Sequence, residues 1–203
     1  MTTATAFSSS RSSRTLPTYK ASAFPSEAAL RLEQTPMSGL EKVFVRGATP
    51  DLDSLVGWEF RGINHLPLNA IPLAQLAGIK KFVKGFHRRE DGKVMGYNSP
   101  VKNNVLDGRW NVGAKRFGFY ETDHVDATSR DNAYLHAVLL DYGKADNGLN
   151  PMSQLRDYLV QVDPANPDLF LGKAYAAVGP LRIPLNFFIL ERFRIGLTDY
   201  ATR

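Results

Sequence analysis

From Gly57 onward the chain repeats one pattern, in which short runs rich in aromatic and β-branched residues are bounded by residues typical of turns. This rhythm is typical of an all-β sandwich or barrel. Because short connections link the runs, the sequence predicts an antiparallel up-and-down β-barrel of about nine strands, closed so that no edge is exposed. The runs cover residues 57–65, 79–88, 93–98, 104–111, 115–122, 133–142, 155–163, 168–177 and 186–195.

Turn-forming residues support this pattern. Asp91-Gly92 lies between two apolar runs, where a β-hairpin turn is expected, and the Pro- and Asn-containing segment 163–168 joins the runs on either side of it. Residues 143–153 and 178–185 contain Asn-Gly, Asn-Pro, Gly-Pro and Ile-Pro pairs. We expect irregular loops there, since proline cannot take part in a central-strand ladder.

Helical signals are few. Residues 26–33 predict a short N-terminal helix that Ser26 caps and that Pro36 prevents from continuing. Residues 49–55 predict a one-turn helix or a tight bend before the first strand. Between the first two strands, residues 72–78 are mostly apolar, begin with proline and end with glycine, which indicates a short helix. This helix would cover one mouth of the barrel, either as a lid over a ligand or as a simple cap on the core.

The N-terminal residues 1–24 are rich in Ser, Thr and Ala and contain no acidic residue. Such a segment cannot bury enough apolar surface to offset its ordering entropy. We therefore expect a disordered extension, followed by a single β-barrel domain over residues 25–203. The extension is also similar to an organelle transit peptide. A cytoplasmic location is expected, with organelle targeting through residues 1–24 as the alternative.

The composition excludes several classes of function. With 0 Cys, the chain holds no disulfide, no thiolate metal site and no cysteine nucleophile. Of its net charge of +5, residues 1–20 contribute +3 through Arg11, Arg14 and Lys20, and the remaining charges are interspersed. We therefore expect no nucleic-acid partner. No apolar run approaches the roughly 18–20 residues of a membrane-spanning helix. The sequence leaves the oligomeric state open.

Alternate residues of a barrel strand face the interior. In the first strand Trp58, Phe60 and Asn64 share one face, and we expect that face inside. Across the strands, faces combine aromatic rings with a few polar groups, which a dry core tolerates only when each is paired. A ligand cavity accommodates such groups, although any one of them could instead face solvent in a cross-strand pair. The candidate ligand-binding residues are Trp58, Phe60, Asn64, Lys84, Tyr97, Tyr120, His136, Tyr158, Tyr175 and Arg192.

Gly57-Trp58 opens the first of these strands, and Arg192 lies on the last. In these positions the chain resembles the lipocalin and fatty-acid-binding (calycin) superfamily, whose first strand carries a Gly-x-Trp motif with a tryptophan that closes one barrel end. Here the tryptophan follows glycine directly, without the usual spacer. The resemblance covers residues 55–196 in architecture but only these few positions in motif. It implies an antiparallel barrel that binds a small hydrophobic molecule, with Arg192 packed over Trp58.

Signals for catalysis and metal binding are few. None of the four histidines has the spacing of a zinc motif, and His124, which lies among acidic residues, is interpreted as part of a solvated turn. Phosphate-loop and serine-hydrolase motifs are missing, so we expect no metal and no cofactor. His136 lies mid-strand among aromatic residues, and it is the candidate acid/base if the barrel is an enzyme. The alternative for His136 is a satisfied core histidine.

One run is strongly basic, since residues 80–89 hold six basic residues and two phenylalanines before Glu90. This run predicts a solvated strand edge protected by lysines, with a rim that attracts anionic lipids or carboxylates as the alternative. The basic residues are Lys80, Lys81, Lys84, His87, Arg88 and Arg89.

The leading hypothesis is a lipocalin-like barrel that binds a small hydrophobic or amphipathic ligand in its interior. Arg192, Lys84 or a tyrosine would orient the polar end of that ligand, which could be a carboxylate. A barrel enzyme of the cyclase or isomerase type, with His136 as acid/base, is the second hypothesis. A structural barrel with a filled core and no ligand is the third.

Overall fold

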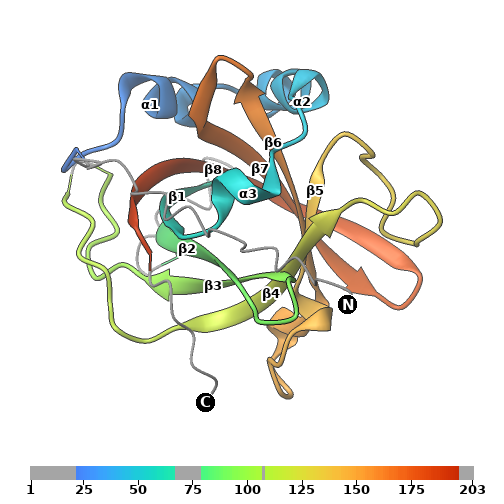
Figure 1. Cartoon of the computed structure of the whole chain (residues 1–203). Coiled ribbons are helices and arrows are strands. Elements are labelled where there is room, and N and C mark those ends of the chain that lie inside the picture. The colour runs from blue at the N-terminus through green and yellow to red at the C-terminus, as the bar shows by residue number, and fades with distance from the viewer. Residues whose placement is uncertain (1–21, 67–78, 107, 197–203) are drawn as a thin grey trace, which may run out of the picture.

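The computed structural model describes residues 22–66, 79–106 and 108–196. Within them, eight antiparallel strands pair in chain order, and β1 pairs with β8 to close a barrel (Figure 1). The all-β antiparallel barrel expected from the sequence is confirmed. The strands are β1 (Trp58–His65), β2 (Lys81–Arg88), β3 (Val94–Pro100), β4 (Phe117–His124), β5 (Val138–Asp141), β6 (Leu155–Asp163), β7 (Asn166–Val178) and β8 (Leu181–Ile195).

One predicted strand is missing from the described residues, because residues 104–106 and 108–111 belong to no strand and lie between β3 and β4. The side chain of Asn103 accepts a hydrogen bond from the backbone N–H of Val105, and the side chain of Asn104 donates to the carbonyl of Val101. Such local bonds compete with a strand ladder for the backbone. A single bridge between Val101 and Val112 is the only pairing recorded at this place in the described chain.

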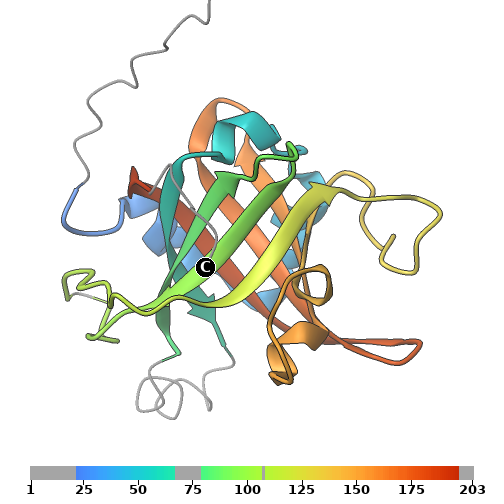
Figure 2. The ribbon, with the colours of Figure 1, turned by 60° about the horizontal axis from the view of Figure 1, so that its bottom comes forward.

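The expectation of an irregular loop over residues 178–185 is wrong. β7 and β8 extend as a hairpin arm, which turns at Gly179 with a φ of +57°. Pro184 is accommodated where the register between the two strands shifts at Ala174/Tyr175, in agreement with the tolerance of β-bulges for proline. Figure 2 shows this arm projecting beyond the rest of the barrel.

Helix α1 (Glu27–Gln34) begins as predicted, because the Ser26 hydroxyl accepts a hydrogen bond from the N–H of Ala29 at 3.2 Å. Helix α3 (Leu52–Leu55) confirms the predicted turn before the first strand. Helix α2 (Met37–Arg46) was not expected from the sequence. The predicted helix over 72–78 and residues 1–21 of the expected N-terminal extension lie outside the described residues, and the single domain over 25–203 stays a prediction.

The barrel wall separates two apolar clusters. The inner cluster fills the closed half of the interior and includes Phe60, Phe86 and Leu190. The outer cluster joins helices α1 and α2 to the outside of β6, β7 and β8, with Leu40 and Phe44 of α2 fully buried (Figure 1). Because the two helices cover the outside of these strands, the strands are apolar on both faces.

Candidate functional site

One end of the barrel is packed shut. The guanidinium of Arg192 lies 4.6 Å from the centre of the Trp58 ring, and its Nε donates to Asp168 at 2.6 Å. The same guanidinium donates to the carbonyl of Ser54 at 3.1 Å, which ties α3 to this end. The packing of arginine over tryptophan is the arrangement that the calycin resemblance implies. This end therefore offers no entrance to a ligand.

The other half of the barrel holds a cavity of about 230 Å³, so the interior is not completely filled. This half is the mouth of the barrel, where β1 ends and β2 begins. Nine of the 16 lining residues are apolar. The lining residues are Asn64, Ile79, Lys81, Phe82, Lys84, Asn98, Pro100, Phe117, Tyr142, Met152, Leu155, Asp157, Ala174, Leu185, Asn186 and Phe188.

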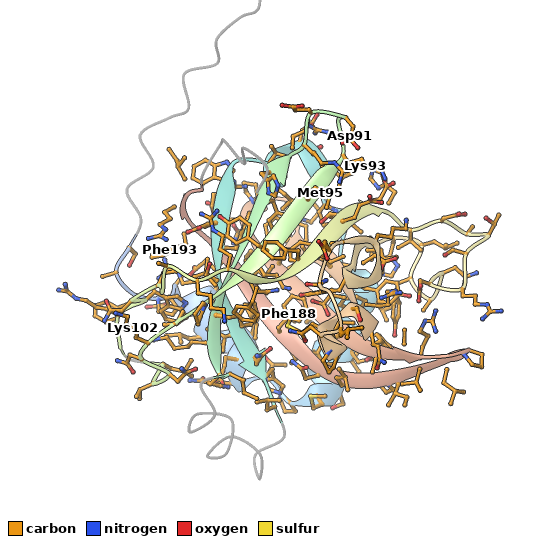
Figure 3. The ribbon with its side chains drawn as sticks, turned by 90° about the horizontal axis from the view of Figure 1, so that it is seen from below. Asp91, Lys93, Met95, Lys102, Phe188 and Phe193 are labelled. Atoms are coloured by element: carbon orange, nitrogen blue, oxygen red, sulfur yellow. The ribbon has the colours of Figure 1, made fainter. Side chains whose placement is uncertain are left out.

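Two phenylalanine rings form the aromatic part of the wall, and each lies over a glycine of the neighbouring strand. Gly62 of β1 pairs with Phe82 of β2, and a Cβ atom on Gly62 would lie 2.3 Å from the Phe82 ring. Gly172 of β7 pairs with Phe188 of β8, where the same distance would be 2.0 Å. The two ring centres are 6.0 Å apart at an angle of 68°, and Figure 3 shows Phe188 within the barrel. Only glycine allows the rings to lie this close to the wall.

A polar cluster lies at the wall of the cavity, centred on the ammonium group of Lys84. Its Nζ donates to Oδ1 of Asn98 at 3.1 Å and to Oδ2 of Asp157 at 3.0 Å, and it also donates to the Tyr142 hydroxyl. The Tyr142 hydroxyl in turn donates to Oδ2 of Asp157 at 3.0 Å. These four side chains come from β2, β3, β6 and the short 3-10 turn η2 (Tyr142–Lys144), so the closed barrel alone brings them together.

Burial dominates the electrostatics of this cluster. Lys84 is 2% exposed, and desolvation lowers its pKa from the ordinary value, while the Asp157 carboxylate partly restores it. Desolvation also raises the pKa of Tyr142 well above its ordinary value, and the nearby Asp157 charge adds to the rise. Four aromatic rings surround the ammonium at 4.7 to 5.6 Å from their centres, which stabilises a desolvated cation.

The hydrogen bonds of the cluster determine what it can offer a ligand. An ammonium group has three N–H donors, and all three of Lys84 are used within the protein. Oδ1 of Asp157 has no hydrogen-bond partner among the described residues. The cluster is therefore a compensated ion pair with spare acceptor capacity and no spare ammonium donor.

Of the ten residues expected to bind a ligand, Asn64 and Lys84 line the cavity. Phe60 and Tyr120 are inside the barrel but belong to its packed core, and Trp58 and Arg192 close the far end. The prediction of the inward face of the first strand agrees with these positions. The structure thus brings Asn64 and Lys84 to the cavity. The other four residues named here lie in the packed core or at the closed end of the barrel.

The remaining four lie outside the barrel, which corrects the expectation that they face the interior. The Tyr97 hydroxyl donates to Glu59 at 2.7 Å on the outer face of β3. Tyr158 and Tyr175 pack edge-to-face on the outer side of β6 and β7, at 5.7 Å between ring centres. His136 precedes the short strand β5, and its Nε2 lies 3.1 Å from the carbonyl of Phe44 in α2. The strand predicted over 133–142 is limited to β5, so His136 is not part of a strand.

Five polar residues of the cavity were not among the predicted ligand-binding residues: Lys81, Asn98, Tyr142, Asp157 and Asn186. Asn186 and Phe188 are alternate residues of β8 and both line the cavity, so the alternation carried a signal for Asn186. Asp157 was missed because its neighbour Tyr158 was chosen on the same strand. At β6 both faces are apolar, and only the pairing of Asp157 with Ala174 of β7 shows which one is inside.

Four of the six basic residues (Lys80, Lys81, Lys84 and His87) are buried and only Arg88 and Arg89 are exposed, so the prediction of a solvated strand edge is wrong for most of the run. Lys80 and Lys81 are 0% exposed. Lys80 forms an ion pair with Glu33 of α1 at 2.7 Å, and Lys81 donates to the carbonyls of Val105 and Gly108. These lysines hold surrounding segments against the start of β2 and are not available to an external anion.

Comparisons of the chain with protein-family models, with curated proteins and with solved structures return no match. Within the described ranges, no helix is long and apolar enough to cross a bilayer. In the same part of the chain, no group of three or more His, Asp or Glu side chains is placed to hold a metal ion. The geometry of the cavity is therefore the basis for a functional proposal.

Proposed function

We propose that this barrel binds a small, neutral, amphipathic molecule in the cavity beside Phe82, Phe188 and Lys84. The observation that supports the proposal is a mostly apolar cavity with one fixed polar cluster in its wall. Small-molecule sites have this composition, in which apolar walls provide affinity and a few polar groups provide orientation. Transfer of ligand surface from water would contribute about 25 cal/mol per Å² of apolar area.

The cavity volume limits the size of the ligand. A cavity of about 150 Å³ holds benzene, and drug-sized sites have volumes of about 300–1,000 Å³. The 230 Å³ of this barrel lies between these values. Scaling from benzene gives a ligand with roughly nine or ten non-hydrogen atoms inside the cavity.

Hydrogen-bond accounting favours a neutral polar end over a carboxylate. The ammonium groups of Lys84 and of Lys81, the other lysine of the lining, donate to acceptors within the protein, so a carboxylate entering the cavity would be a buried charge without a free ammonium donor. The free oxygen of Asp157 would add repulsion. A hydroxyl group instead brings a donor to a site that has spare acceptors. The carboxylate considered at the sequence level is therefore not part of this proposal.

The test compares two probes of equal chain length, 1-octanol and octanoate, by isothermal titration calorimetry at pH 7.5. We expect 1-octanol to bind with at least ten-fold higher affinity than octanoate. The variant Ala174→Leu places a larger side chain in the cavity wall and should weaken octanol binding by ten-fold or more. Ala177→Leu adds the same atoms to the hairpin arm, outside the cavity, and should bind like the wild type.

Two results would contradict the proposal. One is the absence of heat and of any mass shift in native mass spectrometry with both probes at their solubility limits. The other is an equal loss of binding in Ala174→Leu and Ala177→Leu, because the cavity would then have no special part in binding. Tighter binding of octanoate would contradict the neutral polar end alone.

A second candidate function is proton transfer on the bound molecule, as in an isomerase. The specific observation is that an amine, a phenol and a carboxylate lie within hydrogen-bond distance of one another beside the cavity, namely Lys84, Tyr142 and Asp157. The hypothesis no longer involves His136, which lies on the outside. Incubation of the protein with 2-octanone in D₂O should show deuterium uptake beside the carbonyl by NMR, and Asp157→Asn should abolish it. Uptake at the buffer rate would exclude this candidate and leave the binding proposal intact.

We also propose a distant architectural relation to calycin barrels and a reducing, cytoplasmic location. The contact between Arg192 and Trp58 supports the first, since it closes one barrel end as the resemblance implies. The lack of cysteine is compatible with the second. Fusion of residues 1–24 to a fluorescent protein would test the alternative of organelle targeting, because a transit peptide would relocate the reporter.

A further inference from the structure

We propose that the mouth of the barrel docks on a lipid bilayer that contains anionic lipids. The proposal rests on a group of exposed apolar side chains around the cavity entrance, which we call the mouth rim. Large apolar residues that are exposed together mark an interaction surface, whereas scattered ones are ordinary. The mouth rim consists of Ile79 (52% exposed), Val105 (54%), Leu149 (105%), Leu181 (60%), Ile183 (46%) and Leu185 (47%).

The hairpin arm of β7 and β8 supplies half of the mouth rim. Val178 pairs with Leu181, and Ala176 pairs with Ile183, so these four side chains share one face of the arm. Leu155 of β6 pairs with Ala176 and lines the cavity, as Leu185 does. The apolar face of the arm is therefore continuous with the cavity wall, and it extends that wall beyond the barrel (Figure 2).

Basic residues accompany the apolar ones at the same end of the barrel. Segment 101–116, between β3 and β4, carries four basic residues and a single acidic residue, Asp107. The side chains of Lys102, Arg109 and Lys115 are exposed. The N–H of Lys81 donates to the side chain of Asn104 at 2.8 Å, which fixes this segment beside the start of β2 at the mouth. Figure 3 shows Lys102 projecting outward from the barrel.

The closed end carries exposed charges of both signs, because Arg88, Arg89 and Lys93 lie beside its carboxylates. Its exposed side chains include the carboxylates of Asp51, Glu90 and Asp91, and Asp91 lies far from Lys102 in Figure 3. A negatively charged surface would thus attract the mouth, where segment 101–116 carries a net charge of +3, more strongly than the closed end. The cytoplasmic face of a membrane offers such a surface, together with an apolar layer into which the mouth rim can insert.

The charge of the mouth also makes a second copy of the chain an unfavourable partner for the mouth rim. Two copies that met through their mouth rims would bring two segments with net charge +3 together, and like charges across an interface are unfavourable. An anionic bilayer satisfies both the apolar and the basic residues. The inference does not depend on the ligand, because vesicle binding can be measured without one.

The experiment measures co-sedimentation of the full chain with vesicles of phosphatidylcholine alone or with one quarter phosphatidylglycerol. We expect binding to the anionic vesicles only, with a loss as NaCl rises from 0.05 to 0.5 M, since salt screens the attraction. The double variant Lys102→Gln/Arg109→Gln should lower the partition coefficient about 25-fold, at about five-fold per charge. Leu181→Ser/Ile183→Ser should lower it by more than ten-fold.

Helix α2 and Leu135 of the β4–β5 loop supply matched controls that lie outside the mouth rim. Lys42→Gln/Arg46→Gln removes two exposed charges, and Val45→Ser/Leu135→Ser removes two apolar side chains of similar exposure (57% and 61%). We expect both controls to bind anionic vesicles like the wild type. Thermal unfolding of all variants identifies any that lost its fold, and the charge variants test the proposal if the apolar ones fail to fold.

Three outcomes would overturn the proposal. The first is equal binding, or no binding, to the two vesicle types. The second is an equal loss in the mouth variants and in their α2 and loop controls. The third is a wild-type dimer that Leu181→Ser/Ile183→Ser converts to a monomer without any vesicle binding, because the mouth rim would then be an interface between copies of the chain.

Discussion

Lys84 brings a positive charge into the interior of the barrel, where desolvation of an ammonium group is costly. Three hydrogen bonds, the Asp157 carboxylate and a ring of aromatic faces offset that cost. The cluster therefore fixes the arrangement of β2, β3, β6 and η2 more than it adds to stability. Removal of either Lys84 or Asp157 should therefore be strongly destabilising, because the other charge is left buried without its partner.

We expect Lys84→Met to lower the free energy of unfolding by about 3–5 kcal/mol, because it leaves Asp157 buried without its cation. The double variant Lys84→Met/Asp157→Leu should recover much of this loss. Urea denaturation followed by circular dichroism gives both values. Arg89→Met, which breaks an exposed pair with Asp91, is the control and should change stability by less than about 1 kcal/mol. A cost for Lys84→Met as small as that of the control would contradict the expectation.

The tyrosines determine the response to alkaline pH. Desolvation raises the pKa of Tyr158 and of Tyr175 to about 12, and it raises the pKa of Tyr120 and Tyr142 well above 10. Above pH 10 the unfolded chain loses these protons while the folded chain keeps them, so the stability that they contribute is lost as pH rises from 10 to 12. The lowered pKa of Lys84 has the opposite effect on the free energy of unfolding, but Lys84 is a single group, whereas four tyrosines lose their contribution.

Urea denaturation at pH 8, 10 and 11 should therefore show a falling free energy of unfolding between the last two values. Absorbance at 295 nm should show that part of the eight tyrosines ionise only near pH 12 or on unfolding. Tyr158→Phe removes one such group and should make the fall less steep. A constant stability from pH 8 to 11 would show that these phenols are not shielded in the folded state.

At the scale of the strand pair, glycine and phenylalanine act together to shape the cavity. The Phe188 ring lies where a Cβ atom of residue 172 would be, so Gly172→Ala forces the ring to move toward the cavity. We expect a destabilisation of about 1–3 kcal/mol, the usual cost of overpacking. In a Phe188→Leu background the same substitution should cost less, because the ring is gone. A double-mutant cycle by urea denaturation measures this coupling, and additive effects would contradict it.

The elements themselves were predictable where a local signal was strong. The range of β6 was predicted at 155–163, and helix α1 was predicted from its Ser26 cap. Helix α2 was missed because Pro36 was interpreted only as the end of the helix before it, whereas it is the N-cap residue of α2. The run 104–111 has the composition of a strand, but asparagine side chains bind its backbone instead.

The site was less predictable than the elements, for a physical reason. Alternation identifies the inner face of a strand only when the outer face is polar. On β1 it placed Asn64 correctly, whereas on β6 the outer face is apolar as well, because helix α2 packs against it. Asp157 and Tyr158 are neighbours on β6, so one side chain faces the interior and the other faces outward. When both faces are apolar, the sequence pattern does not show which of the two is inside. The pairing register provides what the pattern lacks.

At the scale of the whole molecule, the two ends of the barrel differ in packing. Arg192, Trp58 and helix α3 close one end, and the cavity occupies the other. A barrel tolerates this asymmetry because each strand is held by two neighbours, so the strand ladder does not depend on a filled interior at every level. The open half is therefore expected to share the stability of the packed half.

The two tryptophans can test that expectation, because Trp58 lies at the closed end and Trp110 lies near the mouth, where its Nε1 donates to the carbonyl of Phe82. We expect Trp58→Phe and Trp110→Phe each to unfold in one transition, with the fluorescence of the remaining tryptophan and the far-ultraviolet circular dichroism sharing one urea midpoint. Coincidence of probes is the mark of a single cooperative unit. It would also support the single domain predicted over residues 25–203. If Trp110 fluorescence changed at lower urea than the circular dichroism, the mouth would be a separate, weaker unit.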